Sequence, residues 1–222
     1  MSNCVWWVRT DPLAQDRWAF SVTKPEVSLR ERVHGWQRVQ EAGGRFPDDC
    51  KPLEMQCAHK LNGDGTIGSK KKPATDEKGR RLPNMFYQTY FCIAHEAIEV
   101  FQKFDLGEAQ FYEVDFMEAG GATKIDEPVY ILIPANPKNA FRFSNPDNAA
   151  AALENPQDIS SRRAKSRIPD DAVGVTSDAL GGAHVWIEPN FNGTFFISDS
   201  LAQALRDAGV DADFRLARAQ IV

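Results

Sequence analysis

His95 and Glu99 stand four residues apart, the spacing that places two side chains on one face of a helix. The stretch His95–Glu99 reads HEAIE and begins like the zinc motif H-E-x-x-H. That motif needs a second histidine where this chain has Glu99, and no third ligand is evident. We therefore interpret His95 as a polar residue near the start of a helix, and we predict no metal.

Four other residues could supply metal ligands or a nucleophile: Cys50, Cys57, His59 and Cys92. Six residues separate Cys50 from Cys57, which is not the tight C-x-x-C spacing of strong zinc sites. Scattered cysteines of this kind are more often small buried apolar side chains. We interpret them as structural residues.

Gly63, Gly65 and Gly68 form the pattern G-x-G-x-x-G, which in a dinucleotide site lies between a strand and a helix. No clean strand precedes Gly63, and the following SKKKP with Pro73 cannot form a stable helix. The pattern therefore predicts a loop and no nucleotide cofactor.

The same loop resembles the middle of a calcium-binding loop. Its first and twelfth positions would be Lys60 and Lys71, where calcium needs acidic ligands. We predict no bound calcium and no other cofactor.

Ser198 and His184, with an aspartate nearby, have the residue types of a hydrolase site. No serine lies in a G-x-S-x-G elbow, and a helix N-cap explains Ser198 more simply. We predict no catalytic residue. A small metal-dependent or hydrolytic enzyme remains an alternative, with a site assembled from distant residues such as His95, His184, Cys92 and acids.

Two stretches must position these side chains, and they share one pattern. Phe91–Val114 and Phe195–Leu216 each read as an apolar strand, an amphipathic helix, a glycine and a second extended piece. Apolar residues recur at one constant offset, and in each helix they follow the i, i+3, i+4, i+7 spacing of a buried stripe. The pattern predicts an α+β fold built from duplicated strand–helix–strand units on a mainly antiparallel sheet.

Further strands are expected at residues 4–8, around 18–22, 86–93, 112–116, 129–134 and 184–189, and helices at about 28–42 and 149–153. Residues 141–143 are expected to pair with the strand at 129–134. The polar tract 60–84 and the segment 145–171 predict surface excursions. We expect a single domain, 1–222, with pseudo-repeat lobes of about 1–119 and 120–222 that meet near Gly120 and Gly121.

The composition restricts the partner and the compartment. Lys plus Arg (26) minus Asp plus Glu (31) gives a net charge of −5, which argues against nucleic acid as a partner. No segment is apolar enough to span a membrane, and the N-terminus lacks the apolar core of a signal peptide. Four cysteines do not form a disulfide framework. These features predict a cytoplasmic protein.

The segment HVWIEPNFNGTFFISDSLAQALRDAGVDADFRL, residues 184–216, resembles the C-terminal signature of an immunity-protein family of bacterial polymorphic toxin systems, first catalogued as a domain of unknown function. The matching residues are His184, Trp186, Phe196, Ser198, Leu201, Ala204, Leu205, Ala208, Gly209, Phe214 and Arg215, with a fainter match at Trp36, Gly44 and Phe46. The long loop before Asn84 and the segment after Phe143 depart from the family pattern.

The resemblance implies a non-enzymatic immunity protein that binds and neutralises one cognate toxin or effector with a cytosolic target. Exposed acids are the candidate contacts to a basic toxin, namely Glu96, Glu99, Glu113 and Asp115. A regulatory or scaffold protein remains a further alternative.

Overall fold

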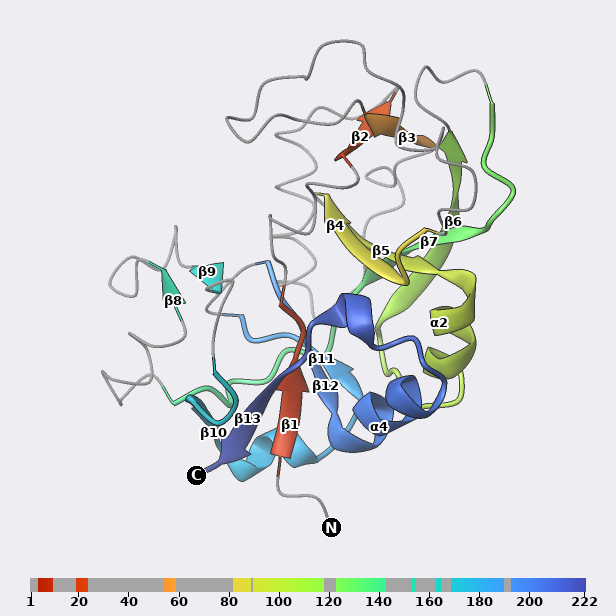
Figure 1. The fold of residues 1–222 in the computed structure, drawn as a ribbon. Coiled ribbons are helices and arrows are strands. Elements are labelled where there is room, and N and C mark those ends of the chain that lie inside the picture. The colour runs from red at the N-terminus through yellow and green to blue at the C-terminus, as the bar shows by residue number, and fades with distance from the viewer. Residues whose placement is uncertain are drawn as a thin grey trace.

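The computed structural model describes residues 4–9, 19–23, 54–58, 82–88, 90–117, 123–142, 153–154, 163–164, 169–189 and 193–222. These residues form an α+β structure with two main sheets, as predicted (Figure 1). Two helices, α2 (His95–Phe101) and α4 (Asp199–Asp207), pack against each other between the sheets.

The first sheet has five strands in the order β10-β13-β1-β12-β11. Their bounds are β1 Cys4–Trp7, β10 Val173–Val175, β11 Val185–Trp186, β12 Phe196–Ser198 and β13 Ala217–Ile221. β1 lies between β12 and β13 and is antiparallel to both, whereas β10 and β13 are parallel. The two ends of the chain therefore meet in one sheet (Figure 1).

The second sheet has six strands in the order β2-β3-β6-β7-β5-β4. Their bounds are β2 Ala19–Thr23, β3 Glu54–Ala58, β4 Met85–Gln88, β5 Tyr90–Ala94, β6 Gln110–Met117 and β7 Val129–Ile133. β7 lies between β5 and β6 and is antiparallel to both, whereas β3 and β6 are parallel. A separate short pair joins β8 (Leu153–Glu154) to β9 (Arg163–Ala164).

Five strands of the second sheet repeat the order and the pairing directions of the first. The series β3-β6-β7-β5-β4 has the same sequence of parallel and antiparallel neighbours as β10-β13-β1-β12-β11. In each sheet a helix follows the fourth strand of the series, α2 after β5 and α4 after β12. A shared topology does not establish a duplication, which stays a prediction.

Contacts between the two units are reciprocal. Asn84, just before β4, donates its backbone N–H to the Asp213 carboxylate beyond α4, at 2.7 Å. His184, just before β11, donates its N–H to the Asp105 carbonyl beyond α2, at 2.8 Å. Each hairpin therefore contacts the loop that follows the helix of the other unit.

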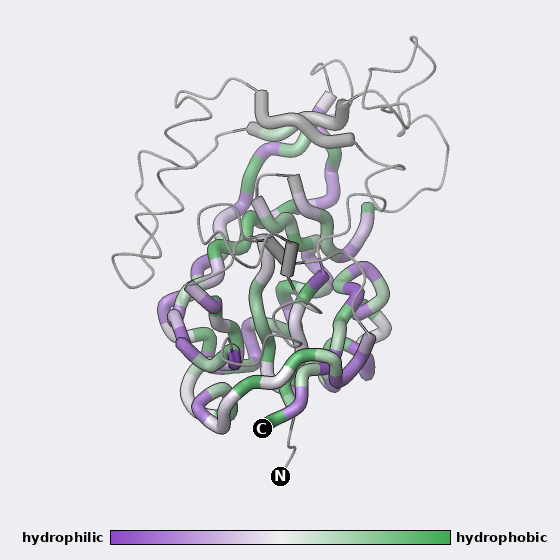
Figure 2. Tube along the Cα trace, turned by 90° about the vertical axis from the view of Figure 1, so that its left-hand side faces the viewer, coloured by the Kyte–Doolittle hydropathy of each residue, from purple (hydrophilic) through white to green (hydrophobic). Residues whose placement is uncertain are grey.

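Three clusters of buried side chains form the core. The central cluster lies between the sheets and contains both helices and the edge-to-face pair Phe91–Phe195, with ring centroids 4.8 Å apart. A second cluster covers the other face of the six-stranded sheet, and a third covers the other face of the five-stranded sheet. Both sheets thus pack against buried side chains on two faces, and Figure 2 shows hydrophobic residues along the described chain.

Several local predictions are confirmed. Ser198 caps α4 because its hydroxyl accepts the backbone N–H of Leu201 at 3.2 Å. The glycine expected after the second helix is Gly209, which takes the left-handed conformation after α4, with φ of 70°, where a residue without Cβ is favoured. β11 and β12 lie in two of the expected strands and form an antiparallel pair.

Other local predictions are wrong. Residues 86–93 do not form one strand, since β4 and β5 pair with each other and Gln88 stands opposite Tyr90. Phe141 bridges to Val175 and not to β7. Phe214 lies in a 3-10 turn, Ala212–Phe214, and the last strand starts at Ala217.

The two sheets do not follow the predicted lobe boundary near residue 120. β1 joins the sheet of the C-terminal strands, and β7, which follows that boundary, joins the earlier one. The single domain stays a prediction. The predicted helix at 28–42, the glycine pattern at 63–68 and most of the excursion at 145–171 lie outside the described residues.

Candidate functional site

His184 and Ser198 are brought together at the start of α4. The His184 Nδ1 lies 2.7 Å from the Ser198 hydroxyl, and Ser200 Oγ lies 3.0 Å from the same hydroxyl. The Ser198 oxygen also accepts the Leu201 N–H that caps the helix. This contact joins the β11 hairpin to the first turn of α4, so its evident role is structural.

The other candidates of an assembled active site lie outside this cluster. Cys92 is fully buried in the second core cluster, and its burial raises the pKa of the thiol far above the ordinary value. The thiol therefore stays protonated and unreactive. His95 lies on the surface at the start of α2, with half of its side chain exposed (51%).

No group of three or more histidine, cysteine or acidic residues in the described part of the chain could hold a metal ion. Among the same residues, no helix is long and apolar enough to cross a membrane. The side chains of Cys50, Cys57 and His59 lie outside the described part.

The predicted acidic contacts cluster around one tyrosine. Tyr130 of β7 stands directly opposite Glu113 of β6 in the sheet register, so the two side chains lie side by side on one face. His95 stacks on the Tyr130 ring with centroids 6.2 Å apart, and Glu99 lies 3.5 Å from the His95 Nε2. We call Glu99, His95, Tyr130 and Glu113 the Tyr130 face.

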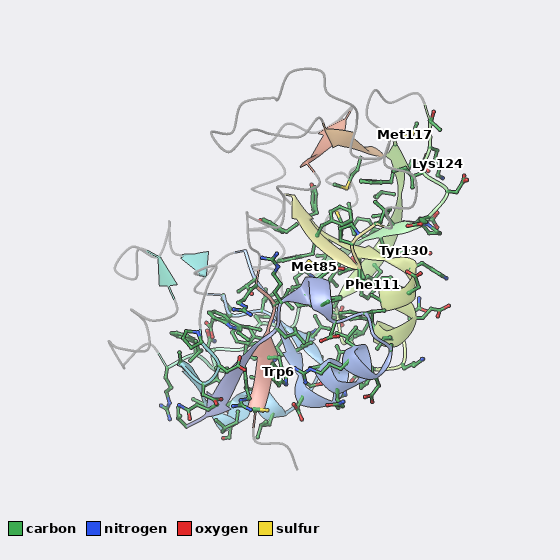
Figure 3. The ribbon with its side chains drawn as sticks, viewed as in Figure 1. Trp6, Met85, Phe111, Met117, Lys124 and Tyr130 are labelled. Carbon is green, nitrogen blue, oxygen red and sulfur yellow. The ribbon has the colours of Figure 1, made fainter. Side chains whose placement is uncertain are left out.

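Asp115 extends this face along β6. It forms an ion pair with Lys124 at 2.5 Å, in which both side chains are more than half exposed. The hydrogen bond to Asp115 raises the pKa of Lys124. Figure 3 shows Lys124 beyond Tyr130, towards Met117 at the end of β6. Glu96 is exposed on α2 and directly follows His95 in the sequence.

Negative charge is concentrated in this unit. Residues 95–117 contain six acids and one lysine, a net charge of 1 − 6 = −5. The corresponding residues 199–221 contain four acids and three arginines, a net charge of 3 − 4 = −1. The net charge of the segment from α2 to β6 thus equals that of the whole chain, −5, and the charges of the remaining residues sum to zero. A surface of this kind attracts a basic partner.

The corresponding position of the other sheet holds Trp6. Its indole N–H donates to the Asp199 carboxylate at 2.7 Å, and the Arg206 guanidinium lies over its ring, 4.0 Å from the centroid. Arg218, opposite Trp6 in the register, forms a bidentate ion pair with Asp171. Figure 3 shows Trp6 on β1, in the sheet that does not hold Tyr130.

A scaffold buried on both sheet faces, with aromatic and charged side chains gathered at one surface, is typical of proteins that bind other proteins. The comparison with known families then gives the particular class. The model of the Immunity protein family (Imm11) matches residues 70–216, and the chain belongs to that family. No curated protein matches the chain.

The structure explains the residues that carry the resemblance to immunity proteins. His184 and Ser198 hold the hairpin against α4, and Trp186 stacks on Phe196 with ring centroids 4.1 Å apart. Leu201 and Leu205 lie on the buried side of α4. These residues hold the scaffold together.

The sequence interpretation did not single out Tyr130, because it predicted only that residues 129–134 form a strand. The alternation of side chains along β6 and β7 puts Tyr130 and Glu113 on one face, but only because these two strands are paired.

Proposed function

We propose that this chain is an immunity protein that binds one cognate bacterial toxin and neutralises it in the cytoplasm without catalysing a reaction. The observation that carries the proposal, beside the family, is the net charge of −5 on residues 95–117. These charges lie on a folded unit whose helix and strands are held by the central core. We propose Glu96, Glu99, Glu113 and Asp115 as contacts to a basic surface of the toxin.

The cytoplasmic setting is supported by the thiol of Cys92. It forms no disulfide and is fully buried as a small apolar side chain. Reduced cysteines are typical of a reducing compartment. A toxin that is neutralised there acts on a cytosolic target, such as a nucleic acid or a nucleotide.

The test is co-expression with the toxin domain encoded by the neighbouring gene. We expect the chain to restore growth and to form a complex that survives gel filtration. Because the contacts are ionic, the dissociation constant should rise strongly between about 50 and 500 mM salt, as the screening length shortens from above to below about 10 Å. A failure to rescue growth, or to bind any neighbouring toxin domain, would refute the proposal.

A matched pair of variants tests the acidic face. Glu113→Gln and Asp178→Asn each remove one negative charge, but Asp178 lies in the 3-10 turn Ser177–Leu180 of the other unit. We expect Glu113→Gln to slow association and weaken binding, with Asp178→Asn close to the parent. Equal effects would show that only the net charge matters.

A further inference from the structure

Tyr130 and Trp6 occupy corresponding positions in the two sheets. Tyr130 pairs with Ile93 on one side and Glu113 on the other. Trp6 pairs with Ile197 on one side and Arg218 on the other. Both aromatic side chains are partly exposed and pack against the central core cluster.

The helices that follow Ile93 and Ile197 also correspond. α2 begins at His95 and α4 at Asp199, each two residues after its isoleucine. Both first residues contact the aromatic ring of their own sheet: His95 stacks on Tyr130, and Asp199 accepts the Trp6 indole N–H.

Around Trp6, the chain itself supplies the cation that lies over the ring. Arg206, in the last turn of α4, covers the face of its ring. A guanidinium over a tryptophan face is a favourable cation–π contact. The second cation of this surface, Arg218, is already bound by Asp171.

Around Tyr130, neither of the two corresponding positions in the described residues holds an arginine. Counting from the first residue of each helix, the position of Arg206 is held by Gln102, and the position of Arg218 in the register is held by Glu113. Within the described residues, the ring contact recorded for Tyr130 is the one with His95. Tyr130 is partly exposed, with the Glu113 carboxylate beside it in the sheet and Glu99 on the far side of His95. A ring with a carboxylate beside it is a site for a cation.

We propose that the cognate toxin places an arginine side chain on Tyr130, beside Glu113, in the way that Arg206 lies on Trp6. This inference rests on the proposed function. Arginine fits better than lysine because its planar guanidinium can stack on a ring and bind a carboxylate with two hydrogen bonds at once. Such a residue would be a dominant contact of the interface.

The first test compares Tyr130→Leu with Tyr130→Phe against the inactivated toxin domain of the neighbouring gene. Both variants keep an apolar side chain against the core, but only phenylalanine keeps an aromatic face. We expect Tyr130→Leu to raise the dissociation constant about tenfold or more and Tyr130→Phe to stay within about threefold of the parent. Thermal unfolding checks that both variants are folded.

The second test identifies the arginine. Each arginine of the toxin domain is changed to alanine, and the dissociation constant of each toxin variant is measured with the parent chain and with Tyr130→Leu. We expect one arginine whose loss weakens binding to the parent about tenfold but has little further effect on Tyr130→Leu. Glu113→Gln should show the same coupling, and Asp178→Asn should not.

The outcomes separate this inference from the proposed function. If the parent chain binds the toxin but Tyr130→Leu binds equally well, or no arginine is coupled to Tyr130, the toxin uses another surface and the inference is overturned. If the parent chain binds no neighbouring toxin domain, the proposed function fails and the inference fails with it.

Discussion

Replacing Ser198 by alanine should destabilise the fold without affecting toxin neutralisation. Ser198 is the N-cap of α4, and its hydroxyl contacts Leu201 N–H at 3.2 Å and His184 Nδ1 at 2.7 Å. An alanine side chain can make neither hydrogen bond. The corresponding N-cap of α2 is Ala94, which has nearly the same backbone conformation but no side-chain cap.

The magnitude follows from these two hydrogen bonds. Removing an N-cap hydroxyl costs about 1 kcal/mol, and removing a partner from the partly buried His184 ring costs about 1 kcal/mol more. The free energy of unfolding should therefore fall by about 2 kcal/mol. The reverse substitution, Ala94→Ser, should raise it by about 0.5 kcal/mol, because it adds the missing cap at a site with the required backbone angles.

Urea unfolding followed by circular dichroism measures both effects. With a slope of about 2.5 kcal/mol per molar, Ser198→Ala should lower the midpoint by about 0.8 M. Toxin binding, measured well below that midpoint, should be unchanged. If Ser198→Ala keeps its stability but loses neutralisation, the His184–Ser198 pair has a chemical role, and the hydrolase alternative returns.

Two further predictions concern the connections between elements. Gly107→Ala should destabilise the fold by about 1–3 kcal/mol, because φ is +55° and an added Cβ would lie 2.3 Å from the Asn136 Oδ1; thermal unfolding measures this. The hydrogen bond from Arg218 lowers the pKa of Asp171, so the pair stabilises the fold above the ordinary carboxyl pKa of about 3.9. That stabilisation is lost as the pH falls through the lower pKa of the folded state. The difference in the free energy of unfolding between the parent and Asp171→Asn should therefore shrink from about pH 7 towards about pH 3, and a difference that stays constant would contradict this assignment.

The local features of the fold could be predicted from the sequence because they depend on neighbouring residues. The Ser198 cap, the left-handed Gly209 and the apolar stripe of α4 need only a short window. The hairpin of β4 and β5 was missed because only Gln88 and Thr89 interrupt the aromatic residues from Phe86 to Phe91. A run of that kind does not show where the chain reverses.

The placement of β1 could not be predicted, because it depends on contacts across the whole chain. In the second sheet the central strand, β7, follows β6 directly, whereas in the first sheet the central strand, β1, comes from the other end of the chain. A search for repeats in chain order finds the strand–helix–strand part of each unit but not the strand that completes it. The Tyr130 face depends on the same strand pairing, since register alone puts Glu113 beside Tyr130.

The two units share some positions and differ at others. Positions that perform the same task in both, such as Phe91 and Phe195 at their contact, hold the units together and cannot distinguish one toxin from another. We propose that specificity comes from positions that correspond in structure but differ in chemistry. Arg218 and Glu113 are the clearest such pair, since opposite charges stand beside the two partly exposed aromatic rings. A change of toxin should therefore be met by substitutions around Tyr130, while His184, Ser198 and Trp186 stay fixed by the fold.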